Sequence, residues 1–336
     1  MIRIALNGFG RIGRNFLRSL ITDPHAEKKI KLKAINIGPA NPEFLPYWVK
    51  HDTIMGPFNG NVSFENNILT INNHPIKIFT ELDPTKLPWK NLDIDWVIEA
   101  TGHFTKREGA EKHLAAGTKK VIISAPAQNE DCSIVMGVNE EVYKNTDKII
   151  SLGSCTTNAL APTLAVLEEN IGIAHASLTT IHSYTNSQVL LDVNDTKIRL
   201  TRAAAVNMIP STTGATKVIG KIIPSLQGKI IGNAVRIPVD KVSLIDLVVV
   251  LNKETSSDKI NEFFSHAAHN NLNEILDITQ EPLVSSDYAG NPHSVVIDGL
   301  LTQCSGPIAK IFGWYDNEWA YSVRIKDFLI KYGTRE

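Results

Sequence analysis

The stretch Gly8-Phe9-Gly10-Arg11-Ile12-Gly13 places three glycines between two segments of different pattern. Residues 2–7 are short and apolar, as in a buried strand, and the chain from Arg14 to about Leu20 has a helical pattern. Glycines at this spacing allow a tight turn and a close backbone approach, so that a pyrophosphate can lie on the helix N-terminus. The stretch therefore predicts a dinucleotide-binding turn.

The segments that follow predict the sheet around this turn. Apolar runs at 30–36, 95–100 and 121–124 alternate with helical stretches, which is typical of a mostly parallel, doubly wound α/β sheet of the Rossmann type. Loops at the carboxyl ends of the strands, around Thr101 and Ser124, are expected to line the cofactor crevice.

The end of the second strand lacks the usual signal for NAD. An acid there would bind the ribose hydroxyls and disfavour a 2′-phosphate. The chain instead continues from Asn36 into Ile37-Gly38-Pro39-Ala40, and the nearest acid is Glu43. No arginine stands there either, so the sequence does not select a phosphate.

A second stretch, Ser151-Leu152-Gly153-Ser154-Cys155-Thr156-Thr157-Asn158, lies between a strand-like run and an apolar periodic segment that begins near Ala159. It predicts a strand-to-helix turn, with Ser154 or Thr156 able to cap the helix. The Cys155 sulfur would then lie over a helix N-terminus, which favours the nucleophilic thiolate. A free cysteine is more often buried and inert. The stretch alone leaves both interpretations open.

The pattern changes beyond Cys155. Long strand-like runs at 176–183 and 242–252 predict a mixed α+β catalytic domain with a largely antiparallel sheet. At 336 residues, about two domains are expected. We expect an NAD(P)-binding domain over residues 1–154, a catalytic domain over 155–318, and a C-terminal helix over 319–336 that packs back on the first domain.

Composition excludes several classes of protein. With 34 basic and 35 acidic residues the net charge is −1, so neither nucleic acid nor a membrane surface is expected as the main partner. No apolar run approaches the roughly 18 residues of a membrane span, and the N-terminus leaves no room for a signal peptide before the glycine motif. Cys132, Cys155 and Cys304 are too far apart for a disulfide framework or a zinc site, which indicates a cytoplasmic protein without a structural metal.

Several motifs together resemble the phosphorylating, type I glyceraldehyde-3-phosphate dehydrogenases. Ser154-Cys155-Thr156-Thr157-Asn158, followed by His182-Ser183-Tyr184-Thr185-Asn186, is similar to their active site. The likeness covers essentially the whole chain. Further motifs in the family's order are Asn7–Arg14, Ile122–Ala127, Pro210–Ala215 and Trp314–Trp319.

The resemblance implies a reaction. Cys155 would attack the aldehyde to give a hemithioacetal, hydride would pass to the nicotinamide, and inorganic phosphate would cleave the resulting thioester to an acyl phosphate. His182 would be the base, a role that suits a histidine beside a cysteine. The Cys155 N–H and the Asn158 side chain are candidate oxyanion donors.

The resemblance also implies binding residues. Thr185 and Arg236 resemble the pocket for the substrate's own phosphate; outside this context both Arg202 and Arg236 would be read as solvated surface charges. The pocket for the attacking phosphate would contain Ser154, Thr156, Arg202, Thr213 and Gly214. The residues expected to bind the cofactor are Asn7, Gly8, Gly10, Arg11, Ile12, Gly13, Asn36, Ile37, Thr101, Gly102, Ser124, Asn317 and Tyr321.

The chain departs from the family pattern at several positions. Leu152-Gly153 replaces the usual Asn-Ala, Ala159 replaces a frequent second cysteine, and Pro57 replaces a common arginine. Val193-Asn194 stands where strictly NAD-dependent members often carry Leu-Pro. Together with Ile37, this predicts NAD as cofactor with NADP tolerated.

The sequence leaves two other hypotheses for the function open. Erythrose-4-phosphate dehydrogenases share the cysteine and the histidine, but they lack the Thr213-Gly214 pair. A catalytically idle scaffold relative is disfavoured by the intact Cys155 and His182. The leading expectation is a homotetrameric enzyme of glucose metabolism (glycolysis) that acts on a small phosphorylated aldehyde and inorganic phosphate.

Overall fold

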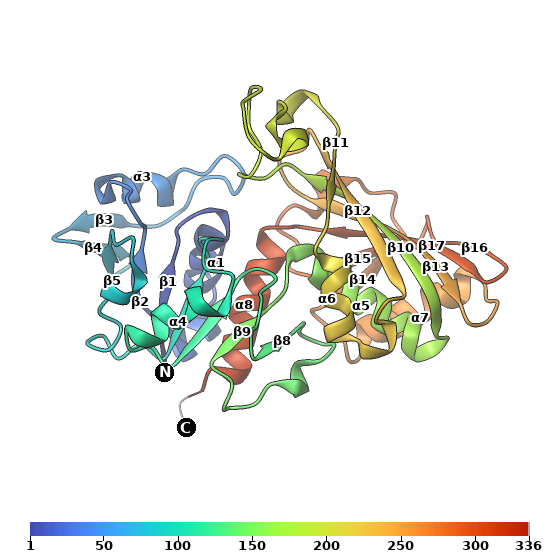
Figure 1. The fold of residues 1–336 in the computed structure, drawn as a ribbon, viewed down its shortest axis with the longest axis horizontal. Coiled ribbons are helices and arrows are strands. Elements are labelled where there is room, and N and C mark those ends of the chain that lie inside the picture. The colour runs from blue at the N-terminus through green and yellow to red at the C-terminus, as the bar shows by residue number, and fades with distance from the viewer. Residues whose placement is uncertain (335–336) are drawn as a thin grey trace. The chain divides into compact units, whose positions relative to one another are not determined.

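The computed structural model describes residues 1–334, which form two compact units (Figure 1). Unit 1 contains Met1–Ile134, Glu141–Gly153 and the chain from Ser322 onward. Unit 2 contains Val135–Glu140 and Ser154–Tyr321. Each unit is built around its own sheet.

Unit 1 is a nine-stranded sheet in the order β3-β4-β5-β2-β1-β6-β7-β9-β8. All neighbouring strands from β5 through β2, β1, β6, β7 and β9 to β8 are parallel. Strands β3 and β4 are antiparallel and extend the sheet beyond β5. Its strands are β1 (Ile2–Asn7), β2 (Ile30–Asn36), β3 (Val62–Glu65), β4 (Ile68–Ile71), β5 (His74–Phe79), β6 (Trp96–Glu99), β7 (Lys120–Ile123), β8 (Cys132–Ser133) and β9 (Ile149–Ser151). Its helices are α1 (Arg11–Ile21), α2 (Pro24–Lys29), α3 (Leu45–Lys50), α4 (Arg107–Ala115) and most of α8 (Trp319–Tyr332).

The C-terminal helix α8 belongs largely to unit 1. Phe328 packs edge-on against Trp96 with a ring distance of 5.8 Å, and Lys326 Nζ lies 2.6 Å from an Asp23 carboxylate oxygen. Phe328 is fully buried. Burial of such a ring is worth about 2 kcal/mol, so the helix is a structural part of this unit.

Unit 2 is built on a mixed sheet in the order β11-β12-β10-β13-β17-β15-β14, with β16 paired to β17. Most neighbours are antiparallel, and the parallel pairs are β10 with β12 and β14 with β15. Its strands are β10 (Ile173–Ser183), β11 (Ile209–Thr212), β12 (Ile230–Ile237), β13 (Ser243–Leu251), β14 (Leu276–Thr279), β15 (Val295–Asp298), β16 (Gln303–Ser305) and β17 (Ile308–Tyr315). Its helices are α5 (Cys155–Asn170), α6 (Ala215–Ile222) and α7 (Ser257–His269).

Helix α5 is the centre of unit 2. It packs against β10, β13, β15 and β17 and against helices α6 and α7 (Figure 1). Strand β13 alternates strictly between buried and half-buried residues, as expected for a sheet with one face under helices. Unit 2 thereby holds the first turn of α5 against the ends of its central strands.

The predicted fold class is confirmed: a Rossmann-type α/β sheet is followed by an α+β unit with a largely antiparallel sheet. Helix α5 begins at Cys155, as expected for a cap at Ser154, and so it starts four residues before the apolar periodic segment at Ala159. The reason is local, because the Ser154 side chain caps the helix and the polar residues behind it can join the first turn.

Among residues 1–334, no helix is both long and apolar enough to cross a lipid bilayer. Within the same range, no group of three or more His, Cys, Asp or Glu side chains is placed to hold a metal ion.

Candidate active site

The glycine turn of unit 1 is sterically specific. Gly8 has a φ of +102°, and a Cβ there would lie 2.7 Å from the Ala100 carbonyl carbon. A Cβ at Gly13 would lie 2.4 Å from the Gly8 oxygen. Gly10, by contrast, faces open space, and as the N-cap residue of α1 it brings no side chain over the helix terminus. The turn therefore leaves room for a phosphate group at the N-terminus of α1, and the residues present fit a dinucleotide.

A buried polar network joins the carboxyl ends of β1, β2 and β6 beside this turn. Asn36 Nδ2 donates to Asn7 Oδ1 (2.7 Å), and Asn7 Nδ2 donates to Glu99 Oε2 (2.6 Å). The same oxygen lies 3.1 Å from His113 Nε2, and Glu99 Oε1 accepts the backbone N–H of Thr101 (2.8 Å). The sequence analysis did not identify Glu99 or His113, since a buried carboxylate and a buried histidine have no local sequence signal.

Other predicted cofactor residues of unit 1 lie at the same edge. The Ser124 N–H donates to the Glu99 carbonyl (3.0 Å), and Gly102 takes a φ of +76° in the turn after β6. The Arg11 side chain instead forms an ion pair with Asp52 (2.5 Å). The Ile12 carbonyl accepts a hydrogen bond from Ser322.

An acidic residue, Glu81, does lie near the end of β2, and it comes from the chain just after β5. β2 and β5 are parallel with Asn36 opposite Phe79, and the Glu81 N–H donates to Asn36 Oδ1 (2.9 Å). Ile37 follows Asn36 directly and donates its N–H to Phe79. The Glu81 carboxylate accepts the N–H of Leu82 (3.1 Å).

In unit 2, Cys155 is the first residue of α5. The Ser154 hydroxyl accepts the Thr157 N–H (3.1 Å) and so caps the helix. The Asn158 side chain donates to the Ser154 carbonyl (2.9 Å), which uses one of its amide protons inside the helix. The sulfur is thus held at the N-terminal end of a rigid, deeply packed helix.

His182 and Arg236 flank this sulfur from adjacent strands. His182 Nε2 lies 3.6 Å from Cys155 Sγ. β10 and β12 run parallel with His182 opposite Arg236, which puts Arg236 Nη1 2.6 Å from His182 Nδ1. The Ser183 carbonyl lies 2.8 Å from the same Nδ1. The two contacts need opposite states of Nδ1, because a guanidinium only donates and requires a lone pair there, whereas a carbonyl only accepts and requires a proton there.

Burial dominates the electrostatics of the pair. Burial and then the Arg236 charge lower the pKa of His182 to about 3. Although Cys155 keeps some exposed surface, desolvation raises the pKa of its thiol, while Arg236 and hydrogen bonds from Thr156 lower it in part. The pKa of the thiol is raised overall, because desolvation of a thiolate outweighs the Arg236 charge and these hydrogen bonds.

Three buried hydroxyl groups lie behind the cysteine. Tyr315 at the end of β17 is hydrogen-bonded to Thr156 Oγ1 (2.9 Å) and to Thr180 Oγ1 (2.8 Å). The Tyr315 ring also meets the His182 ring edge-on, with a centroid distance of 6.0 Å. The sequence analysis assigned no role to Tyr315 or Thr180.

Of the two predicted nicotinamide residues in unit 2, Asn317 is held in place by serines. Asn317 Oδ1 accepts hydrogen bonds from the Ser183 hydroxyl (2.9 Å) and the Ser243 hydroxyl (3.1 Å). These two donors orient the Asn317 amide so that its NH₂ group points away from them. Tyr321 is buried at the start of α8.

The predicted phosphate residues lie in different settings. Thr185 Oγ1 is 2.9 Å from Ser187 Oγ, and the Thr213 hydroxyl accepts the Ala215 N–H beside Gly214 at the start of α6. The Arg202 side chain is 61% exposed and pairs with Asp192. Two arginines, Arg202 and Arg236, were predicted to bind phosphate. Of these two, Arg236 contacts the cysteine–histidine pair, through His182.

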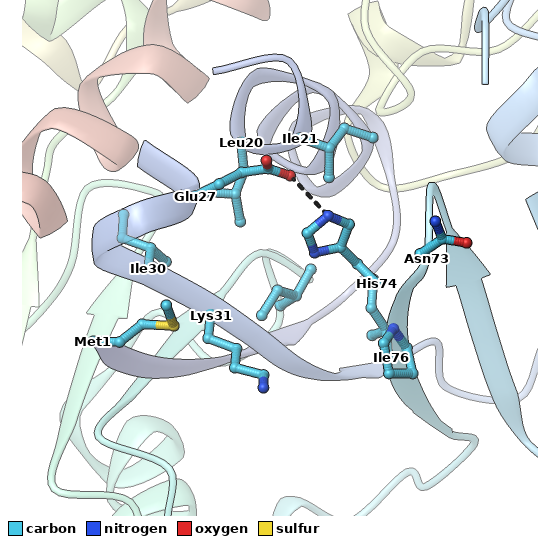
Figure 2. A pocket seen from close by; sticks show the side chains of 11 residues that line it. Met1, Leu20, Ile21, Glu27, Ile30, Lys31, Asn73, His74 and Ile76 are labelled. Atoms are coloured by element: carbon cyan, nitrogen blue, oxygen red, sulfur yellow. Dashed lines mark ion pairs between the residues drawn. The ribbon is translucent and has the colours of Figure 1, made fainter. Parts of the chain in front are cut away.

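A separate hollow of about 310 Å³ lies at the opposite end of the unit 1 sheet (Figure 2). Met1, Ile30 and Ile76 line it from the beginnings of their strands, and His74 faces Glu27 across it (3.5 Å). Because the glycine turn is at the carboxyl ends of the same strands, this hollow is not part of the cofactor edge.

The dinucleotide-binding turn of unit 1 and the cysteine–histidine pair of unit 2 define an oxidoreductase of the nicotinamide-dependent class. Comparison with known proteins specifies the class further. Residues 2–107 match the NAD-binding domain of glyceraldehyde 3-phosphate dehydrogenase, and residues 154–317 match the C-terminal domain of that enzyme.

Curated relatives are similar to this chain over nearly their whole length. Glyceraldehyde-3-phosphate dehydrogenase 1 of Bacillus cereus is 46% identical, with 97% of each chain covered. The enzyme of Streptomyces coelicolor is 45% identical over 99% of each chain, and that of Geobacillus stearothermophilus is 45% identical over 97% of this chain and 96% of its own. The chain belongs to the glyceraldehyde-3-phosphate dehydrogenase family, and its first unit contains that family's NAD-binding domain.

Proposed function

We propose that this protein oxidises D-glyceraldehyde 3-phosphate to 1,3-bisphosphoglycerate through a thioester on Cys155, with inorganic phosphate as the acyl acceptor. The observation that carries the proposal is the cluster of Cys155, His182 and Arg236, with 3.6 Å between sulfur and imidazole and 2.6 Å between imidazole and guanidinium. A nucleophile, a base and a cation for a phosphate are thereby combined at one place.

Substrate binding would prepare the base. Arg236 Nε has no hydrogen-bond partner within residues 1–334, so the guanidinium retains a donor for an anion. A substrate phosphate that attracts Arg236 and Thr185 would release His182 Nδ1, which can then take the proton and donate it to the Ser183 carbonyl 2.8 Å away. Nε2 would become an acceptor for the thiol proton.

The proton transfers would then follow in sequence. His182 takes the Cys155 proton while the sulfur attacks the aldehyde carbon, and it passes this proton to the carbonyl oxygen, which becomes the hemithioacetal hydroxyl. It next takes the hydroxyl proton as hydride leaves the carbon, and a thioester remains. NAD would supply the hydride acceptor when bound, and the family resemblance implies that the Asn317 amide orients its nicotinamide. A phosphate oxygen finally attacks the thioester carbonyl, the C–S bond breaks, and Cys155 is regenerated.

Phosphate dependence tests this proposal. With glyceraldehyde 3-phosphate, steady-state reduction should rise with phosphate and saturate, and arsenate should substitute. Without phosphate, a burst of about one reduced cofactor per site should precede a slow phase, because the thioester waits for its acceptor.

Arg202→Ala should weaken the phosphate dependence about 10-fold or more and largely spare the burst. Arg236→Ala should instead raise the KM for the aldehyde. Stopped-flow absorbance of the reduced nicotinamide measures both phases.

The rival activity makes the opposite prediction. An erythrose-4-phosphate dehydrogenase would turn over that sugar phosphate efficiently with water as acceptor, independently of phosphate. That result would contradict the proposed substrate and acceptor. A protein that binds the cofactor but shows no burst with either aldehyde would support the idle scaffold relative.

We infer that NAD is used and that NADP is tolerated. The end of β2 carries Ile37 rather than an acid, so the ratio of kcat/KM for NAD to that for NADP should stay below about a thousandfold. Ile37→Asp should raise the ratio about tenfold or more, because a carboxylate repels the 2′-phosphate. Glu81→Gln tests in the same way whether Glu81, which follows β5 and lies near the end of β2, disfavours NADP. A preference above a thousandfold that falls in Glu81→Gln would contradict tolerance and identify Glu81 as the selecting residue.

We also propose a homotetramer, in line with the family resemblance. Large apolar side chains are left exposed in one part of unit 2, among them Leu190 (82%) and Ile198 (77%). Such surface is typical of an interface between subunits. The other exposed apolar residues between 190 and 231 are Leu191, Val193, Val206, Met208 and Ile231.

A further inference from the structure

Glu99 is a buried carboxylate, 1% exposed, at the carboxyl end of β6 beside the glycine turn. Its Oε2 lies 2.6 Å from Asn7 Nδ2 and 3.1 Å from His113 Nε2, and its Oε1 lies 2.8 Å from the Thr101 backbone nitrogen. The Thr101 hydroxyl donates to the same Oε1. Four groups therefore face one carboxylate, which is about the number of hydrogen bonds that its two oxygens can accept.

Backbone groups fix the direction of the hydrogen bond from Asn7. The Glu81 N–H donates to Asn36 Oδ1 (2.9 Å) and the Glu81 carbonyl accepts from Asn36 Nδ2 (2.8 Å), so the Asn36 amide has one orientation. Asn36 Nδ2 therefore also donates to Asn7 Oδ1 (2.7 Å), and the NH₂ group of Asn7 must face Glu99.

An indole fixes the direction of the hydrogen bond from His113. Trp89 Nε1 lies 3.1 Å from His113 Nδ1, and an indole N–H only donates, so Nδ1 carries the lone pair. The ring proton is then on Nε2, which faces Glu99. Trp89 and His113 are both 0% exposed, so these hydrogen bonds are shielded from water. Because every contact of the Glu99 carboxylate is with a donor, Glu99 is the anion at the centre of the network.

Glu99 also holds the chain that follows β6 against the glycine turn. The backbone there passes so close to Gly8 that a Cβ on Gly8 would lie 2.7 Å from the Ala100 carbonyl carbon and 2.8 Å from Thr101 N. The position of this backbone is therefore set by Gly8 on one side and by the hydrogen bonds to Glu99 Oε1 on the other. A shift of Thr101 would deform the turn on which a dinucleotide lies.

We propose that Glu99 is a positioning residue for NAD: it fixes Thr101 against Gly8 and the Asn7 amide beside them, and so keeps the dinucleotide turn in its binding conformation. The Asn7 amide and the Thr101 N–H and hydroxyl are used inside this network, so Asn7 and Thr101 act on the cofactor mainly through their backbone position. The inference concerns the NAD-binding domain alone and is independent of the thioester chemistry.

The experiment measures the dissociation constant of NAD for the intact enzyme by isothermal titration calorimetry. Glu99→Gln keeps the size of the side chain, but its NH₂ group must face either Asn7 and His113 or Thr101, so that donors meet inside the core. NAD binding should weaken about tenfold or more. Hydrogen–deuterium exchange, followed by mass spectrometry, should become faster in the peptide that contains Thr101. Asn7→Asp should weaken binding at least as much, because it places a second carboxylate against Glu99.

The double variant Asn7→Asp with Glu99→Gln exchanges the amide and the carboxylate. The amide at position 99 can then donate to the carboxylate at position 7. His113 Nε2 can donate to that carboxylate as well, since it lies 3.4 Å from Asn7 Nδ2. The affinity for NAD should recover at least about threefold relative to each single variant, a coupling that a mere loss of packing would not produce.

Asp95→Asn is the matched control. Asp95 is a buried carboxylate directly before β6, at the opposite end of the same strand, and it accepts hydrogen bonds from the Arg3 N–H (2.9 Å) and Lys119 Nζ (2.8 Å). Asp95→Asn should lower the melting temperature but leave the affinity for NAD within about twofold of the wild type.

Three results would overturn the proposal: unchanged NAD affinity in Glu99→Gln, a double variant no better than the single variants, or equal weakening in Asp95→Asn. If Glu99→Gln does not fold, His113→Gln and His113→Leu decide. The glutamine amide can still donate to Glu99 and leucine cannot, so NAD should bind more weakly to His113→Leu. Equal affinities in these two variants would contradict the role of Glu99.

Discussion

Replacement of Cys155 by serine is expected to abolish aldehyde oxidation while cofactor binding persists. A serine hydroxyl at the same place is a far weaker nucleophile than a thiolate, so the burst of reduced cofactor should fall by at least about 10³-fold. The glycine turn of unit 1 is untouched, and the affinity for NAD, followed by quenching of protein fluorescence, should stay within about twofold of the wild type.

The other two cysteines provide matched controls. Burial and the nearby acids Asp147, Asp131 and Glu130 raise the pKa of Cys132, and burial raises that of Cys304. Among residues 1–334, no cation or imidazole acts on either thiol as His182 and Arg236 act on Cys155, so Cys132→Ser and Cys304→Ser should retain full activity. Iodoacetamide labelling of the wild type should be centred on Cys155. Labelling mainly at Cys132 or Cys304, or activity that survives in Cys155→Ser, would exclude the thioester mechanism.

Replacement of His182 by glutamine should slow the first turnover by about 10²- to 10⁴-fold, since the base for the thiol and hydroxyl protons is lost.

The burst rate is expected to rise with pH. Because the pKa of His182 is lowered to about 3, the imidazole is neutral above that pH and the sulfur alone limits the rate. The pKa of Cys155 is raised, so the wild-type burst rate should increase with pH until the sulfur ionises. In His182→Gln this increase should move to still higher pH.

His175→Gln is the control for this variant. His175 lies on the same strand, β10, but it is exposed and on the opposite face. Stopped-flow bursts across a pH series should leave His175→Gln like the wild type. A burst in His182→Gln within about threefold of the wild type would remove His182 from the proton transfers.

Local sequence patterns predict a large part of this fold because their meaning depends on short-range geometry. Gly8 and Gly13 fit a turn that side chains at these two positions would block, and the structure has that turn between β1 and α1. Ser154 before an apolar periodic segment predicts a cap, and Ser154 caps α5. Alternating and apolar runs likewise predicted the two kinds of sheet.

Motifs also predicted which residues belong to the candidate site, but not how each is used. The Arg236 contact with His182 depends on the register of β10 against β12, two strands that are more than 40 residues apart in the chain. The same holds for Tyr315 behind Thr156 and for Glu99 beside Asn7. No short stretch of sequence encodes such pairs, since they form only when distant strands align.

The sequence by itself therefore predicted the two-unit fold and the dinucleotide turn, and it indicated Cys155 as a candidate nucleophile at a helix N-terminus. Only the tertiary structure decided the electrostatic state of that cysteine. Desolvation by the surrounding core raises the pKa of the thiol, and burial together with the Arg236 charge on the neighbouring strand lowers the pKa of His182. Both effects act through space over a few ångströms in a medium of low dielectric constant, where the nearest charge outweighs the position of a residue in the chain.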